Sequence, residues 1–395
     1  MSENLLAKHK RLDVVDSLRG FALLAIVLLH NLEHYNLISI PENMPSWLMS
    51  LDEGVWNTTF FLLAGKAYAT FSLLFGFSFY IQLRNERNRG GDFRLRFAWR
   101  MLILFMFSQL HALFYNGDIL LLYSVVGLFM ILVCNLKDKT VFIIAIICLL
   151  QPAEWIRLIY SIYDPNLVTY GNYFMKYAIE AGPAMSGSSF IELLKSNITV
   201  GQLYSNFWQV ENGRLFQTFA LFMFGMLLGR RDYFVKTDSS TKNWKKILLY
   251  SAVAFVPLHA LRVYIPGVVE NEAAKLPLGI IIPSLTNFAF MGVLVSSFTL
   301  LWFKASGYKF QRLLIPYGRM TLTNYIVQSI IGVSVYYGFG LGLYKYTGAT
   351  LCILIGIVIF VIQLLFSRWW LSTHRHGPLE HIWFKLTWIG RRDRK

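Results

Sequence analysis

Histidine and carboxylate side chains occur within apolar stretches of this chain, where inserting an ionisable group costs about 2.5–3.5 kcal/mol and each such group is a candidate for function. His30, Glu33 and His34 are spaced i, i+3 and i+4, which places them on one face of a helix that runs through all three. A histidine beside a carboxylate can act as a general base near neutral pH. The same residues could instead form a polar helix end in interfacial water, and the spacing leaves both interpretations open.

A second histidine and carboxylate lie on either side of a short turn. His111 stands near the end of one apolar stretch, and Asp118 precedes the next in the segment Asn-Gly-Asp-Ile-Leu. This carboxylate could orient the histidine, or it could cap the following helix. We predict catalytic roles for His30, Glu33, His111 and Asp118.

Four arginines lie where apolar stretches begin. Arg94, Arg96 and Arg100 lead into one stretch, and Arg319 opens another. Guanidinium groups gathered at one membrane face can bind phosphate through bidentate hydrogen bonds, so we predict that these four hold an anionic cosubstrate. Anchoring of the chain at the basic side of the membrane explains each arginine equally well.

Lys66 and the polar residues of a later stretch are candidates for substrate binding. Lys66 lies about eleven residues into its stretch, and Thr321, Asn324 and Gln328 share one helical face. Lys66 could also be a lysine that snorkels from a re-entrant loop. Asn324 and Gln328 could simply form hydrogen bonds between helices.

Several familiar motifs are absent from the sequence. It has no Walker loop, no zinc-binding histidine pair with a general base, and no Gly-x-Ser-x-Gly elbow. Cys134, Cys148 and Cys352 fall in apolar stretches without metal or redox spacing. We therefore predict no metal site, no disulfide framework and no covalently bound cofactor.

Recurring apolar stretches, long enough to cross a bilayer core of about 30 Å, must position these side chains. The 395 residues are 55% hydrophobic and 15% charged, against about 45–50% and about 25% in soluble domains. The second stretch is too long for one simple crossing, so it could tilt, or it could divide near Gly65 into a short re-entrant piece and a full helix. The pattern predicts an all-α bundle of about ten transmembrane helices, at residues 18–36, 55–83, 97–115, 119–136, 139–161, 213–230, 245–265, 277–303, 316–339 and 347–371.

Lysine and arginine follow an alternating pattern in the connections. They crowd the N-terminal arm, every second connection and the C-terminal tail, whereas residues 37–54 contain none. Because positively charged loops stay in the cytoplasm, both termini are predicted to be cytoplasmic. The segment 162–212 is then extracytoplasmic, and we expect it to form a cap of short helices inserted in a single membrane domain, 1–395. The net charge of +15 is then explained by topology and contacts with lipid headgroups, not by nucleic-acid binding.

Five segments, in order along the whole chain, resemble the YeiB-like bacterial membrane proteins, a family with a domain of unknown function. They are RLDVVDSLRGFALLAIVLLHN (Arg11–Asn31), GKAYATFSLLFGFSF (Gly65–Phe79), GDILLLYSVVG (Gly117–Gly127), GRMTLTNYIVQS (Gly318–Ser329) and GPLEHIWFKLT (Gly377–Thr387). The resemblance implies a multi-pass protein of the bacterial cytoplasmic (inner) membrane.

These proteins look distantly related to the transmembrane acyltransferase superfamily, which includes the acyltransferase-3 enzymes and the lysosomal heparan-glucosaminide acetyltransferase. Acyltransferase-3 proteins open with a similar Asp-x-x-Arg segment and carry a histidine at the end of that helix. Asp16, Arg19 and His30 match that pattern, which adds Asp16 and Arg19 to the substrate-binding candidates. Many YeiB-like proteins carry asparagine at the position of His30, so the family pattern does not require a histidine there.

The superfamily resemblance implies transfer of an acyl group from cytoplasmic acyl-CoA, a cosubstrate, to an envelope glycan, lipid or small molecule outside. The phosphates of acyl-CoA would bind to Arg96 and Arg100, and His30 would act as general base or carry the acyl group. A small-molecule transporter with a polar path through Lys66, His111 and Asn324 is the alternative, although no internal repeat supports it. A structural or regulatory membrane protein is the third hypothesis. The sequence leaves the oligomeric state open.

Reporter fusions can test the alternating topology. Because basic loops stay inside, Asn4 and Arg394 should be cytoplasmic, and fusions after Arg89 and within Ser186–Ser189 should report opposite sides of the membrane. The same side for both fusions would refute the topology.

Overall fold

The computed structural model describes residues 11–41, 44–164 and 173–390, and these ranges contain helices and connections but no strand. The basic residues predicted to anchor both ends, Lys8 and Lys10 and then Arg391 to Lys395, lie outside the described residues. The helices are α1 (Asp13–Leu32), α2 (Ser46–Leu63), α3 (Lys66–Arg87), α4 (Arg94–Ala112), α5 (Leu120–Val133), α6 (Asp138–Leu149), α7 (Pro152–Tyr163), α8 (Tyr173–Ser186), α9 (Phe190–Ser196), α10 (Gln202–Glu211), α11 (Arg214–Arg230), α12 (Asp238–Val268), α13 (Glu272–Ala305), α14 (Lys309–Arg319), α15 (Thr321–Tyr336), α16 (Ala349–Thr373) and α17 (Pro378–Thr387). The predicted all-α bundle is therefore confirmed.

Several helices have the length and composition of membrane spans. In the described part of the chain, four helical stretches are long and apolar enough to cross a bilayer: α2 with α3, α12, α13 and α16. Helices α6 and α7, which meet at 43°, make a fifth if they count as one span. The apolar part of α12 is not buried inside the protein at all, so its side chains face outward, as lipid contact requires. The chain is a helical membrane protein, and the number of ten crossings stays a prediction.

Three of the predicted stretches are broken rather than continuous. The second divides at Gly65, which was one of its two predicted alternatives, because this residue has a φ of +77° and a Cβ there would overlap the Asn287 side chain. The fifth breaks at Gln151, whose φ of +59° is held by hydrogen bonds to the Gly213 carbonyl and the Ser284 hydroxyl. The ninth consists of the end of α14 and all of α15.

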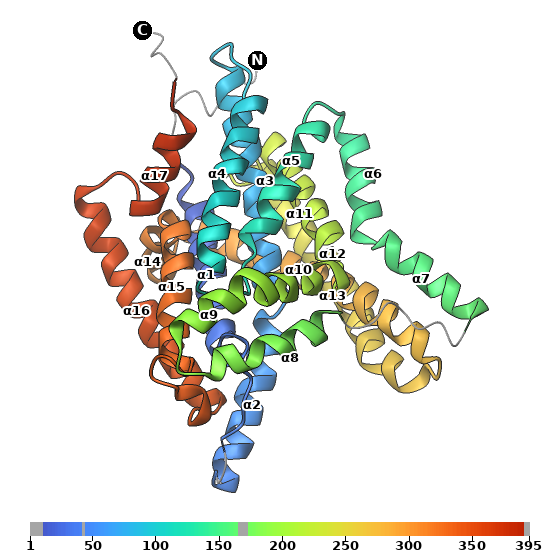
Figure 1. The fold of residues 1–395 in the computed structure, drawn as a ribbon. Coiled ribbons are helices and arrows are strands. Elements are labelled where there is room, and N and C mark those ends of the chain that lie inside the picture. The colour runs from blue at the N-terminus through green and yellow to red at the C-terminus, as the bar shows by residue number, and fades with distance from the viewer. Residues whose placement is uncertain (1–10, 42–43, 165–172, 391–395) are drawn as a thin grey trace.

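The basic connections predicted to share one side of the membrane lie together at one end of the bundle. Arg230, at the end of α11, donates to the Cys134 and Leu136 carbonyls and pairs with Asp138 at 2.8 Å. Arg84, near the end of α3, pairs with Asp232 at 2.8 Å. Helix α17 lies at this end, while α2 extends from the opposite one (Figure 1).

The segment between α7 and α11 contains short helices, as expected for a cap. Helices α8, α9 and α10 run across the bundle rather than along it (Figure 1). Residues 165–172 of the predicted 162–212 segment lie outside the described residues.

Two pairs of helices cross at glycines, where their backbones come into contact. Helices α1 and α14 meet at Gly20 and Gly318, and a Cβ at Gly318 would overlap the Asp16 carbonyl oxygen. Helices α3 and α11 meet in the same way at Gly76 and Gly225. Small residues allow such close approach and are typical of helix contacts in membranes. The first crossing also sets Arg19 and Arg319, the neighbours of its glycines, in the same region of the bundle.

Substitution at the α1–α14 crossing should separate the two backbones. We expect Gly318→Ala to lower stability by about 1–3 kcal/mol, the usual cost of overpacking, measured as the thermal midpoint of the detergent-purified protein. The matched control is Gly279→Ala in α13, where an added Cβ meets no atom within 4 Å. That change should be neutral or slightly stabilising, because alanine favours helix over glycine. Equal midpoints for the two variants would contradict the backbone contact.

Candidate functional site

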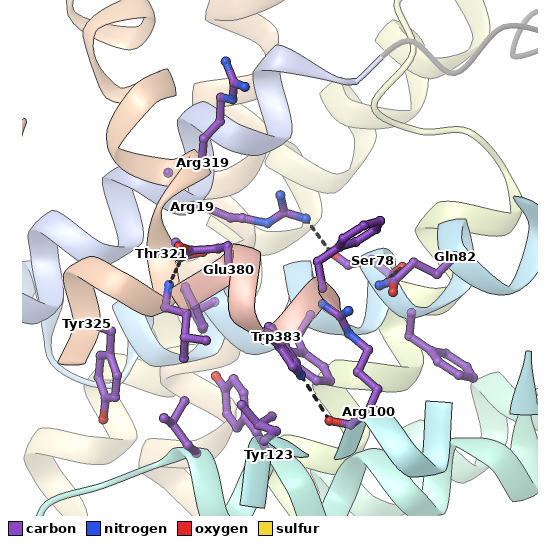
Figure 2. A pocket seen from close by; sticks show the side chains of 18 of the residues that line it. Arg19, Ser78, Gln82, Arg100, Tyr123, Arg319, Thr321, Tyr325, Glu380 and Trp383 are labelled. Atoms are coloured by element: carbon purple, nitrogen blue, oxygen red, sulfur yellow. Dashed lines mark hydrogen bonds between the residues drawn. The ribbon is translucent and has the colours of Figure 1, made fainter. Parts of the chain in front are cut away.

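A cavity of about 550 Å³ lies between α1, α3, α4, α5, α14, α15 and α17, and Figure 2 shows part of its lining. Along α3 the lining changes from Asn85, Gln82 and Ser78, near the basic end, to Phe75, Phe71 and Tyr68 toward the other end. The cavity therefore has a polar mouth and an aromatic interior. Such a shape suits an amphiphilic molecule with a charged or polar head.

Arginines and a histidine surround the mouth: Arg11, Arg19, Arg100, Arg319 and His376. Asp16, only 1% exposed, pairs with both Arg11 and Arg19, and Arg19 also donates to the Ser78 hydroxyl. Asp16 thus fixes the direction of Arg19 at the cavity wall. Burial, followed by the nearby positive charges of Arg11, Arg375 and Arg319, lowers the pKa of His376.

Arg100 and Arg319 have no carboxylate partner among the described residues. The Arg100 guanidinium lies 3.7 Å from the Trp383 ring centroid and makes one long hydrogen bond, 3.4 Å, to the Thr387 hydroxyl. Arg319 donates to the Arg375 carbonyl at 3.2 Å, while its buried Nε has no partner in the described ranges. Both guanidinium groups therefore keep donors and full charge for an anion.

Helix α17 forms one wall of the cavity and is held by specific contacts. The Glu380 carboxylate accepts hydrogen bonds from the backbone N–H groups of Leu322 and Thr323, at 2.7 and 3.1 Å. It thereby caps the start of α15 from a distant part of the chain. Trp383 donates to the Arg100 carbonyl at 3.2 Å (Figure 2).

His111 and Asp118 form a buried pair beside the aromatic interior. His111 Nδ1 lies 2.7 Å from Asp118 Oδ1, and the other carboxylate oxygen accepts from the Ser108 hydroxyl and the Leu121 N–H. When Nδ1 carries the proton donated to Asp118, Nε2 is the basic nitrogen. This Nε2 is buried without a hydrogen-bond partner in the described structure. The ring lies 5.2 Å from that of Tyr325, which lines the cavity.

His30 lies near the His111–Asp118 pair, with Tyr115 between His30 and His111. Its Nδ1 is 3.3 Å from the Tyr115 hydroxyl, and the Tyr115 ring lies 5.5 Å from the His30 ring and 5.9 Å from the His111 ring. The structure therefore brings His30, His111 and Asp118 together through Tyr115. The Asp118 carboxylate, however, is the partner of His111 and not of His30.

The prediction that His30, Glu33 and His34 lie on one face of a helix is wrong. Helix α1 ends at Leu32, Glu33 is its C-cap, and the chain turns away because His34 and Tyr35 have positive φ angles. His34 Nε2 lies 2.7 Å from the Thr347 carbonyl and 3.2 Å from the Cys352 sulfur. No hydrogen bond joins Glu33 to His30 in the described part of the chain.

Arg94 and Arg96 lie outside the cavity lining, as do His30, Glu33, His111 and Asp118. Arg94 pairs with Asp92 at the surface. Arg96 donates to the Thr387 and Ile389 carbonyls at the end of α17, so it positions that helix.

Among the polar candidates on α3 and α15, Lys66 and Asn324 have other partners. Lys66 donates to the Phe61 carbonyl. Asn324 donates to the Ser367 hydroxyl of α16, which is the hydrogen bond between helices considered as its alternative role. Gln328 is fully buried, and both of its amide atoms lack partners among the described residues.

Sequence analysis missed most of the cavity lining. Tyr68, Tyr123 and Tyr325 supply its aromatic interior, and Glu380 and Trp383 belong to a helix that was not expected as an element. A signal was present in the aromatic run Tyr68–Tyr80, which has a ring or small residue at nearly every inward position. The segment Gly377–Thr387 was noticed only as a family motif.

The chain is similar to known proteins along nearly its full length. The family model "Protein of unknown function (DUF418)" matches residues 228–390. The uncharacterized protein YxaH of Bacillus subtilis is 26% identical over 96% of this chain and 95% of its own length, and the uncharacterized protein YeiB of Escherichia coli is 25% identical over 94% and 95%. The DUF418 region contributes α14, α15 and α17 to the cavity, whereas α1, α3, α4 and α5 come from the preceding half. The chain is therefore similar along nearly its full length to YeiB-like proteins, and residues 228–390 match the domain of unknown function DUF418.

Proposed function

We propose that this protein is a transmembrane acyltransferase that takes its acyl group from acyl-CoA. The observation that supports the proposal is one cavity that leads from unpaired arginines at its mouth to an aromatic interior beside a carboxylate-oriented histidine. An acyl-CoA combines phosphates, a polar linker and an apolar acyl chain in the same order.

The donor would place its phosphates on Arg100 and Arg319, with Arg19 nearby. Each guanidinium offers several N–H donors to phosphate oxygens, and neither Arg100 nor Arg319 forms a direct ion pair with a carboxylate of the described chain. Trp383, which lies against Arg100, offers a ring for the adenine base. The acyl thioester would extend past Phe75 and Tyr123 toward Tyr325.

The transfer would use His111 as the general base. Its Nε2 accepts the proton of an acceptor hydroxyl or amine while the acceptor oxygen or nitrogen bonds to the thioester carbonyl carbon. The carbon–sulfur bond then breaks, and the CoA thiolate takes up the proton from the imidazolium. Asp118 stabilises that imidazolium and keeps Nδ1 as the donor. His30 and Tyr115 extend the same polar chain and would orient the acceptor.

The orientation in the membrane belongs to the proposal as well. The protein would lie in the bacterial cytoplasmic membrane with both termini inside, so the basic end of the bundle and the cavity mouth face cytoplasmic acyl-CoA. The acceptor would be an envelope glycan, a lipid or a small molecule on the other side. The transporter alternative has less support, because the hydrogen bonds of Lys66 and Asn324, two residues of its polar path, hold helices together, and no internal repeat supports alternating access.

Removing the unpaired arginines should weaken donor binding. We expect Arg100→Ala and Arg319→Ala each to lower the affinity for acetyl-CoA about tenfold or more, since a hydrogen bond to a charged group contributes about 1.5–3 kcal/mol. Isothermal titration calorimetry with the purified protein measures this affinity. Arg94→Ala is the matched control, because Arg94 lies on the same helix outside the cavity and should leave binding unchanged. The proposed donor site is refuted if the cavity variants bind as the wild type does.

The base is tested by the release of CoA thiol from acetyl-CoA in membrane vesicles that supply the acceptor. Loss of a general base costs about 10²–10⁴-fold in turnover, so His111→Ala should lose turnover by about that factor while still binding acetyl-CoA. His30→Asn retains a hydrogen bond to Tyr115 and should cost much less. If His30→Asn abolishes turnover and His111→Ala does not, the base is His30 and the assignment to His111 fails.

A further inference from the structure

The break between α2 and α3 places a buried positive charge at the side of the bundle. Lys66, the first residue of α3, is 3% exposed, and its ammonium donates to the Phe61 carbonyl at 2.8 Å. That hydrogen bond satisfies a carbonyl freed by the helix break but leaves the lysine charge uncompensated. Two further N–H groups of the ammonium remain for other acceptors.

Arg262 of α12 brings a second positive charge to the same place. Its guanidinium makes a long hydrogen bond, 3.5 Å, to the Asn287 side chain of α13, next to Gly65. Because Asn287 lies against Gly65, the residue before Lys66, the Arg262 guanidinium and Lys66 are held in the same region by this contact. Arg262 is exposed on the outward face of α12. One cation is thus buried and the other faces the lipid.

No acidic side chain of the surrounding helices offsets this pair. Along α2, α3, α12 and α13, every aspartate and glutamate is at least about two helical turns from Lys66, Arg262 and Asn287. Asp52 of α2 accepts from the Thr350 N–H of α16, and Glu272 of α13 pairs with Lys275. Two neighbouring cations at a lipid-facing surface are costly without an anion, so an anionic ligand would stabilise this arrangement.

Aromatic rings adjoin the cations. Phe61, Phe255 and Phe290 are in mutual contact, with ring centroids 4.8–6.2 Å apart. Phe61 and Phe290 also lie 5.8 and 5.5 Å from the Lys66 ammonium, and Phe61 is 42% exposed. A ligand here would therefore meet positive charge at one end and an apolar surface beside it.

We propose that Lys66 and Arg262 bind the phosphate of an anionic phospholipid, whose acyl chains lie along Phe61 and the outward face of α12. The lipid environment of α12 supplies such molecules, and basic sites between membrane helices bind lipid headgroups. This site is separate from the acyl-CoA cavity, because none of its residues lines that cavity. It does not depend on the proposed transferase activity.

Native mass spectrometry of the full chain, released from detergent micelles with added phosphatidylglycerol, tests the site. Arg262→Gln and Lys66→Gln should each weaken phosphatidylglycerol binding about tenfold or more, because each variant loses a hydrogen bond to a charged group, and such a loss lowers the affinity by about that factor. Lys275→Gln is the control, because Lys275 lies on α13 and is already paired with Glu272. It should bind as the wild type does. Because Arg262 is exposed, Arg262→Gln should fold, and its lipid binding tests the site even if Lys66→Gln does not fold.

Two further samples separate the lipid from other ligands. Phosphatidylcholine, which has a phosphate but no net charge, should bind more weakly than phosphatidylglycerol, and inorganic phosphate at millimolar concentration should not displace the lipid. Equal binding of phosphatidylglycerol by the wild type and Arg262→Gln would overturn the proposal. Displacement by inorganic phosphate would also overturn it, in favour of a free-anion site.

Discussion

The contact between the backbones of α1 and α14 determines where the charges of the cavity mouth can lie. Gly20 and Gly318 remove the side chains that would separate these helices, so peptide groups meet directly. Helix packing in a membrane depends on such van der Waals contact, because lipid tails compete equally for apolar side chains. The residues beside the two glycines, Arg19 and Arg319, both line the mouth. The close packing of α1 against α14 therefore also brings the positive charges of Arg19 and Arg319 to the cavity mouth.

The structure handles positive charges in two ways. Asp16 pairs with both Arg11 and Arg19 and holds them in fixed positions, and Asp138 does the same for Arg230 and Arg231. Among the described residues, Arg100, Arg319, Lys66 and Arg262 form no ion pair, and their direct contacts are with carbonyls, amides, hydroxyls and aromatic rings. Neutral contacts of this kind position a cation and leave its charge available. The arginines paired with aspartates therefore stabilise the fold, whereas the cations without an ion pair can bind an anion.

Much of the fold could be predicted from the sequence, because apolar length and the alternation of basic loops are local properties. The break at Gly65 was also visible, since glycine tolerates the positive φ found there. The break at Gln151 was not, because it depends on hydrogen bonds to Gly213 and Ser284, residues far along the chain. His111 and Asp118 could be paired because one short turn joins them. The choice of Arg100 and Arg319 over Arg94 and Arg96 could not be made, since it depends on where α17 packs, and a short amphipathic helix gives little signal of its position.

Glu380 gives the last helix of the chain a role in the order of assembly. Until α17 has been synthesised, the first N–H groups of α15 lack the carboxylate that caps them, and the wall containing Trp383 does not exist. During translation the preceding helices can insert and pair, but the mouth of the cavity is completed only when the C-terminal segment folds back onto them. A ribosome that stops shortly before this segment would release a nearly full set of membrane helices with an open, unfinished cavity.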